Sequence, residues 1–68
     1  GVSKNFIESH YWYSQSAYEG NHWAMYRLGN LYKFGKGVSQ DDGISIMWFT
    51  KASEAGNNLA RITLERSK

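Results

Sequence analysis

Two amphipathic helical patterns follow one another in residues 24–56, which read AMYRLGNLYKFGKGVSQDDGISIMWFTKASEAG. In the first pattern, apolar residues recur at i, i+4, i+7 and i+8, at Ala24, Leu28, Leu31 and Tyr32. In the second, they recur at i, i+3, i+4 and i+8, at Ile44, Met47, Trp48 and Ala52. Both spacings place the apolar side chains on one face of an α-helix. The stretch therefore predicts two helices, each with one face directed at a core.

Glycines and capping residues mark the ends of these two helices. We expect the first helix over 22–34, ended by Gly35 and Gly37, because a left-handed C-cap favours glycine. Asp41 suits the N-cap of the next helix, and Gly56 follows at its C-terminal end. The connection between them is short, so the two helices should be antiparallel neighbours.

The chain also repeats with a period of 36 residues. When the sequence is aligned with itself at this offset, nine of 32 pairs are identical, among them Trp12 with Trp48. The period lies in the range of helical solenoids, and it predicts two further helices over 5–18 and 58–66. A chance recurrence of tryptophan in an ordinary three-helix bundle is the alternative, but the glycines recur in register as well.

Composition narrows the class of protein further. A chain of 68 residues is at most one small domain, and the absence of cysteine removes disulfides, thiol catalysis and cysteine-type zinc sites. A hydrophobic fraction of 41% fits a globular chain. The net charge of +2 is weaker than the clustered basic surface of nucleic-acid-binding proteins, so we expect no nucleic acid as partner. No apolar run has the length of a membrane span, so we expect no direct membrane insertion.

The residues resemble the Sel-1-like repeat, a relative of the tetratricopeptide repeat. The unit of that family combines alanines, a leucine-glycine pair, spaced glycines, an acidic residue and an aromatic pair. The positions that match in order and spacing are Ala24, Leu28, Gly29, Tyr32, Gly35, Gly37, Val38, Asp41, Trp48, Phe49, Ala52 and Gly56. Glu65 departs from the pattern, because the family has glycine there.

The resemblance implies an all-α fold, an α/α superhelical solenoid of helix-turn-helix repeats with about two units. We expect a single domain over 1–68 that is a fragment of a longer solenoid, with one unit over 1–36 and an incomplete unit over 37–68. The parent protein would supply a further helix before Gly1. Neighbouring repeats of the parent chain, or a second copy, would cover the apolar ends.

The resemblance also implies a non-enzymatic scaffold or adaptor for protein–protein interaction. In such solenoids one helix of each unit lines the concave surface, and here that helix is 22–34. Tyrosine and tryptophan are common interface anchors, and neither Trp23 nor Tyr26 is a core position of the family. The candidate residues for binding a peptide or protein ligand are Trp23, Tyr26, Arg27, Asn30 and Lys33.

Other parts of the sequence are expected to be structural. Trp12 and Trp48 occupy core positions of the family, so both should be buried. The connector Gly35–Gln40 should be solvated, although Lys36 could offer a second contact edge. Its Gly35-Lys36-Gly37 run lacks the strand and the Lys-Ser/Thr ending of a phosphate-binding loop.

Two alternative functions stay open. One is a carbohydrate- or cell-wall-binding module, which needs coplanar exposed aromatic rings. The other is an envelope enzyme of the Sel-1-like repeat β-lactamase type, but those relatives carry a cysteine pair in each repeat. Glu8, His10 and His22 are the one group that resembles an acid–base or metal site, and Glu8 and His10 point away from each other on a helix. We therefore predict no catalytic residue, no metal and no cofactor.

Overall fold

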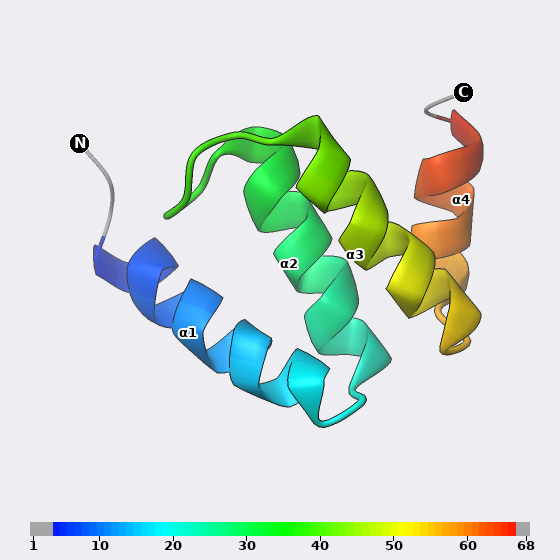
Figure 1. The fold of residues 1–68 in the computed structure, drawn as a ribbon, viewed down its shortest axis with the longest axis horizontal. Helices are drawn as coiled ribbons and strands as arrows, with labels where there is room; N and C mark the ends of the chain where they lie inside the picture. Colours follow the sequence, from blue (N-terminus) through cyan, green and yellow to red (C-terminus); the bar gives the residue numbers. More distant parts are fainter. Residues whose placement is uncertain (1–3, 67–68) are drawn as a thin grey trace.

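The computed structural model describes residues 4–66, and these residues form four α-helices joined by short connections. The helices are α1 (Lys4–Tyr18), α2 (His22–Phe34), α3 (Asp42–Glu54) and α4 (Asn58–Arg66). They follow one another across the molecule, so that α2 lies between α1 and α3 and α3 lies between α2 and α4 (Figure 1). The predicted all-α solenoid of helix-turn-helix repeats is confirmed. Gly1, before which a further helix is expected, lies outside the described residues.

Capping contacts explain where α2 and α3 begin and end. The Asn21 side-chain oxygen accepts a hydrogen bond from the Ala24 N–H at 3.2 Å, and the Asp41 carboxylate accepts one from the Ile44 N–H at 2.9 Å. Each contact satisfies a backbone donor that has no partner inside the helix. At the other end of α2, Gly35 has a φ of +67°, in the left-handed region that favours glycine.

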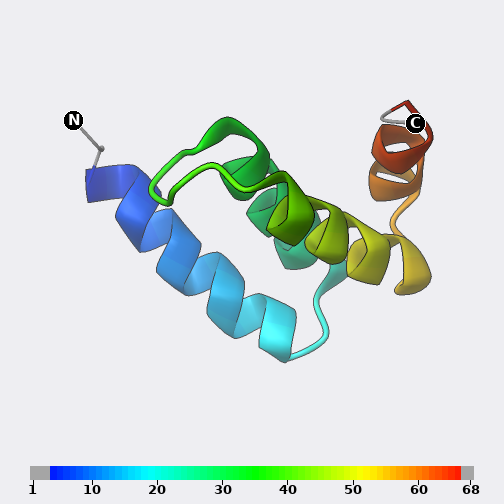
Figure 2. The same cartoon turned by 45° about the horizontal axis from the view of Figure 1, so that its top comes forward.

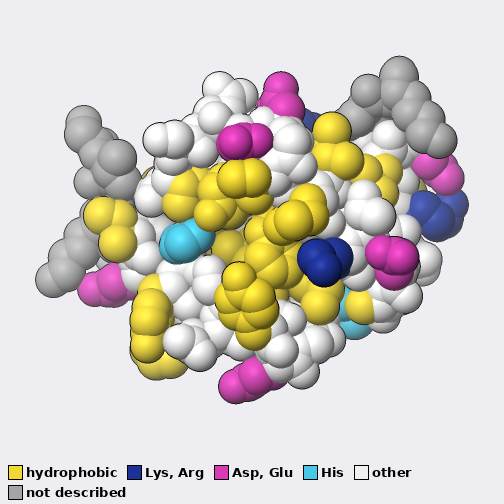
Figure 3. Space-filling model, viewed as in Figure 1, with side chains coloured by type: hydrophobic (Ala, Val, Ile, Leu, Met, Phe, Trp, Pro, Cys, Tyr) yellow, Lys and Arg dark blue, Asp and Glu magenta, His cyan; other side chains and the backbone are white. Residues whose placement is uncertain are grey.

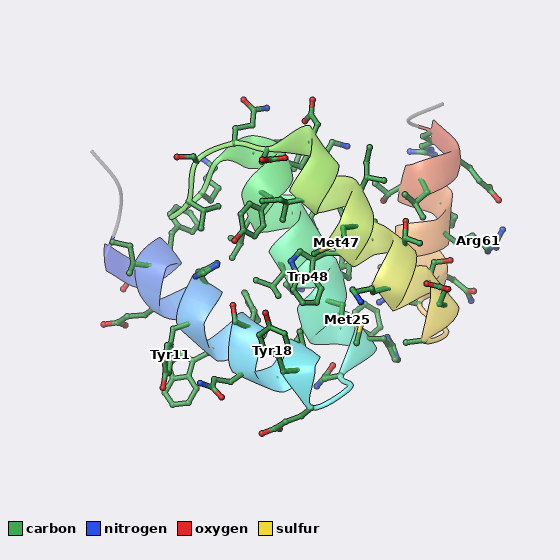
Figure 4. The ribbon with its side chains drawn as sticks, in the orientation of Figure 1. Tyr11, Tyr18, Met25, Met47, Trp48 and Arg61 are labelled. Carbon is green, nitrogen blue, oxygen red and sulfur yellow. The ribbon has the colours of Figure 1, made fainter. Side chains whose placement is uncertain are left out.

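Two clusters of buried side chains hold the helices together. The first joins α1, α2 and α3 through Ala17, Ala24, Leu28, Leu31 and Trp48. The second joins α3 to α4 through Phe49, Ala52 and Ala60, with the partly buried Met25, Tyr26 and Leu64 packed against it. Figure 4 shows Trp48 of α3 beside Tyr18 of α1, and their ring centroids lie 5.9 Å apart in an edge-to-face arrangement. Alanines allow the helix axes to come close, and the rings fill the remaining space.

Helices α2 and α3 approach each other closely at Gly29. A Cβ atom on this residue would lie 2.6 Å from Cε1 of the Phe49 ring, so only glycine fits there. The buried hydroxyl of Ser45, one turn earlier on α3, donates a hydrogen bond to the Gly29 carbonyl oxygen at 2.9 Å. Both contacts reach the same residue of α2, and together they fix the register of the two helices.

The connector between α2 and α3 packs against α1. A Cβ atom at Gly37 would lie 2.6 Å from the backbone oxygen of Phe6, and Val38 packs against the first core cluster. Figure 2 shows this loop reaching the first turns of α1. The expectation of a solvated connector is therefore corrected at these two residues, because the glycine lets the backbone pass close to α1.

The two aligned tryptophans have different surroundings. Trp48 is 7% exposed, whereas Trp12 is 66% exposed. The prediction of burial is confirmed for Trp48 and wrong for Trp12. Helix α1, which precedes α3 by one period, covers the ring of Trp48. The helix that would cover Trp12 in the same way would precede α1 by one period, and no helix among residues 4–66 occupies that place.

The exposure difference predicts different costs for removing the two rings. Trp48→Ala should lower the free energy of unfolding by about 3–5 kcal/mol, because a buried aromatic side chain leaves a cavity. Trp12→Ala should change it by less than about 0.5 kcal/mol. Urea unfolding followed by circular dichroism measures both values, and equal losses would contradict the surroundings described for these residues.

Candidate functional site

The five predicted partner-binding residues lie along one side of α2. They are Trp23, Tyr26, Arg27, Asn30 and Lys33, and we call them the α2 stripe. Their helical spacing keeps them within about a third of the helix circumference. Trp23 is 51% exposed and Arg27 is exposed, whereas the other three are half-buried. The other side of α2 supplies Ala24, Leu28 and Leu31 to the core.

Two aromatic rings form the N-terminal end of the α2 stripe. The centroids of Trp23 and Tyr26 lie 6.3 Å apart, and the ring planes are nearly perpendicular at 85°. Tyr26 also lies 5.8 Å from Phe49, a buried residue of α3. One side of Tyr26 therefore packs against the core. The Trp23 ring is more exposed, so a bound partner could cover more of its surface.

Two hollows border the α2 stripe. The first, which we call the α1–α2 groove, has a volume of about 240 Å³ and is lined by Phe6, Ser9, Tyr13, Arg27, Asn30, Leu31, Phe34 and Lys36. The second lies between α2 and α3, has a volume of about 260 Å³, and is lined by Lys33, Asp42, Ser45, Ile46 and Phe49. The stripe thus separates the two hollows, with Arg27 and Asn30 on one side and Lys33 on the other.

The α2 stripe carries positive charge. Helix α2 contains Arg27 and Lys33 and no aspartate or glutamate. The Lys33 ammonium lies 5.6 Å from the centre of the Phe34 ring, and the Lys36 ammonium lies 5.5 Å from that of Phe6. These distances allow cation–π attraction, which keeps the ammonium groups next to apolar surface.

Three residues of this region are not among the five predicted binding residues, and one of them, Lys36, is the second contact edge that the sequence suggests. Phe34 is 61% exposed and lines the α1–α2 groove together with Phe6 and Lys36. Phe34 stands four residues after Asn30, so helical spacing alone could have added it to the stripe. Phe6 belongs to a different helix, and only the fold brings it to this groove.

The group of Glu8, His10 and His22 does not come together. The Nε2 atom of His10 lies 3.1 Å from the Tyr32 hydroxyl, and the Nδ1 atom of His22 lies 3.1 Å from the side-chain nitrogen of Asn57. Within residues 4–66, no three histidine, aspartate or glutamate side chains are grouped so that they could hold a metal ion. None of the helices described for these residues is long and apolar enough to span a bilayer.

The face of the molecule drawn in Figure 3 is apolar at its centre. Figure 3 shows hydrophobic side chains gathered between α1 and α3. Tyr18 and Met47 contribute to this face, and they are 81% and 43% exposed. It carries few charged groups near its centre, so it differs in character from the α2 stripe.

Comparison with known proteins agrees with this architecture. The family model described as Sel1 repeat matches residues 1–21 and 24–57. The chain belongs to the Sel1 repeat family. Sel1 repeats are generally helical repeats for protein interaction, and the family is typically non-enzymatic.

One relative of this Sel1 repeat chain is a putative sel1-like repeat-containing protein of Acanthamoeba polyphaga mimivirus. The two are 37% identical over 54 residues, which is 79% of this chain. The chain spans only 10% of the length of that relative. No solved structure shows significant similarity.

Asn57 connects α4 with the first residue of α2 through side-chain hydrogen bonds. Its side chain is buried, with 2% of the residue exposed. Its oxygen accepts a hydrogen bond from the Ala60 N–H at 2.9 Å and so caps α4, while its nitrogen donates to His22 at 3.1 Å. The aligned residue in the first copy, Asn21, caps α2 in the same way but is exposed.

The matched pair of caps gives a stability prediction. Asn21→Ala should lower the free energy of unfolding by about 1 kcal/mol, the usual value for an N-cap. Asn57→Ala should lower it by about 2 kcal/mol or more, because it also leaves buried polar groups without a partner. Urea unfolding of the two variants checks this order, and a larger loss for Asn21→Ala would contradict it.

Proposed function

We propose that this Sel1 repeat protein is a non-enzymatic scaffold that binds an acidic peptide or protein segment on the α2 stripe. The observation that supports this most directly is the composition of that stripe. It combines an exposed tryptophan with two cations, and α2 contains no acidic residue. A partner with carboxylates would gain charge-assisted hydrogen bonds, and arginine can form two of them to one carboxylate.

Shape supports the same proposal. The stripe runs between two hollows of about 240 and 260 Å³, which could receive apolar side chains of a bound segment. Trp23 within the stripe and Phe34, which follows its last residue Lys33, are both exposed. Interface energy usually comes from a few aromatic and arginine side chains, so Trp23 and Arg27 are the expected anchors.

The carbohydrate-binding alternative receives less support from the ring geometry. Stacking on a sugar favours coplanar exposed rings on one face. The planes of Trp23 and Tyr26 lie at 85°, and those of the exposed pair Tyr11 and Trp12 lie at 80°. Each pair therefore presents one ring face and one ring edge, which suits side chains of a peptide better than a flat sugar platform.

A displayed library of random peptides tests the proposed function. Selection on the wild-type protein should enrich peptides that contain aspartate or glutamate next to apolar residues. The double variant Arg27→Ala and Asn30→Ala should bind the selected peptides at least about 10-fold more weakly, a change of roughly 1.4 kcal/mol. Binding should also weaken between 50 and 500 mM salt, because exposed charges are screened.

Arg61→Ala provides the matched control. Arg61 is exposed on α4 and pairs with Glu65 at 3.0 Å, away from the α2 stripe. This variant should bind the selected peptides as the wild-type protein does. If the Arg27→Ala and Asn30→Ala variant keeps full affinity while circular dichroism shows an intact fold, the α2 stripe is not the binding surface.

A further inference from the structure

Two histidines each connect a pair of helices, through partners of different chemistry. The Nε2 atom of His10, on α1, lies 3.1 Å from the Tyr32 hydroxyl of α2. The Nδ1 atom of His22, the first residue of α2, lies 3.1 Å from the side-chain nitrogen of Asn57, which precedes α4. Both rings are half-buried. Histidine gains or loses its charge between about pH 5 and 8, so these are the contacts through which pH can act on the fold.

The other contacts of Asn57 fix the orientation of its amide. Its oxygen accepts a hydrogen bond from the Ala60 N–H at 2.9 Å. Its nitrogen also lies 3.5 Å from the backbone oxygen of His22, which is an acceptor. If the amide were turned over, its nitrogen would face the Ala60 N–H, and two donors would meet. The Asn57 nitrogen therefore donates to Nδ1 of His22, and this ring atom carries no proton.

Protonation of His22 brings two donors face to face. The charged ring carries a proton on Nδ1, which then points at the amide nitrogen of Asn57. Turning the amide would offer its oxygen to the ring, but it would take that oxygen away from the Ala60 N–H. One hydrogen bond of Asn57 is lost in either orientation. Because Asn57 is only 2% exposed, water has little access to replace the lost partner.

Helix α4 is the element that this loss affects. It has nine residues, and Ala60 is its one buried residue. Isolated helices shorter than about 12 residues are marginal in water, so α4 depends on its cap and on its packing. That packing joins Ala60 to Phe49 and Ala52 of α3. Loss of a hydrogen bond at Asn57 therefore favours separation of α4 from the rest of the molecule.

The contact of His10 does not share this sensitivity. A hydroxyl group can both donate and accept a hydrogen bond. When His10 is protonated, Tyr32 can turn its hydroxyl so that the oxygen accepts from Nε2. The contact between α1 and α2 is therefore possible in both charge states, and His10 provides a matched comparison within the same chain.

No carboxylate of residues 4–66 pairs with His22. The Trp23 ring lies 5.4 Å from the His22 ring, but it is the next residue of α2 and stays there whether or not α4 is attached. The titratable groups on the surrounding elements make no ion pair or hydrogen bond with the His22 ring, and Arg61 pairs with Glu65 instead. These groups are Glu19 after α1, Tyr26 on α2, Lys51 and Glu54 on α3, and Arg61 on α4.

We propose that His22 and Asn57 form a pH-sensitive switch that controls the attachment of α4. With His22 neutral, the hydrogen bond from Asn57 holds α4 against α2. With His22 protonated, this bond is lost, and α4 separates more often and uncovers Phe49. The proposal does not rest on the proposed function, because neither His22 nor Asn57 belongs to the α2 stripe.

Hydrogen exchange of the α4 amides tests the switch. The protection of the Ile62 and Leu64 amides is measured by NMR at pH 7.5 and pH 5.5 and corrected for the intrinsic pH dependence of exchange. Protection in the wild-type protein should be at least about threefold lower at pH 5.5, because local opening of α4 becomes more frequent.

Two histidine variants assign the response to one ring. In His22→Asn, the side-chain oxygen takes the place of Nδ1 as an acceptor and does not titrate, and asparagine already occupies the aligned position 58. This variant should show equal α4 protection at the two pH values. His10→Gln is the matched control, and it should keep the full response of the wild-type protein.

Asn57→Asp changes the direction of the response. A carboxylate can still cap α4, and its second oxygen accepts a hydrogen bond from a protonated His22. Protection of α4 at pH 5.5 should then be at least as high as at pH 7.5.

Three results would overturn the proposal. The first is equal α4 protection of the wild-type protein at the two pH values. The second is a loss of protection in His22→Asn that is as large as in the wild-type protein. The third is a His10→Gln variant that no longer responds to pH, because it would assign the response to the other ring. The histidine variants keep the test decisive even if Asn57→Asp does not fold.

Discussion

The packing of Phe49 on Gly29 is the contact on which the rest of the structure depends. The ring comes so close to the α2 backbone that no side chain fits between them. A glycine inside a helix costs about 1 kcal/mol relative to alanine. Burying a phenylalanine side chain stabilises the fold by about 1.5–3 kcal/mol. This gain exceeds the cost of the glycine, so the close contact is favourable. Because α2 and α3 are held at this distance, Trp48 reaches α1 on one side and Ala52 reaches α4 on the other.

Much of this fold could be predicted from the sequence, since it depends on local chemistry. The apolar period of α2 and α3, the caps at Asn21 and Asp41, and the left-handed glycine at Gly35 are properties of a few neighbouring residues. The α2 stripe also follows from helical spacing alone. The Sel1 family model matches residues 1–21 and 24–57, a region that contains these residues, so sequence and structure agree at this level.

The parts that could not be predicted depend on neighbours in space. Trp12 and Trp48 occupy the same position of the repeat, yet their exposed fractions are 66% and 7%. The difference arises because α1 covers Trp48, whereas no helix among residues 4–66 covers Trp12 in the same way. The approach of the connector to α1 and the position of Phe6 beside Lys36 are also set by tertiary packing. Likewise, the division of the α2 stripe between two hollows could not be read from α2 alone, since α1 and α3 supply the other walls.

A double-mutant cycle on Gly29 and Phe49 tests the central contact most directly. Gly29→Ala alone should lower the free energy of unfolding by about 1–3 kcal/mol, because the added methyl group meets the ring. In a Phe49→Leu background the same change should cost at least about 1 kcal/mol less, since the smaller side chain can give way and alanine favours the helix. Urea unfolding of the four proteins measures this coupling. Additive effects of the two substitutions would contradict the role assigned to the contact.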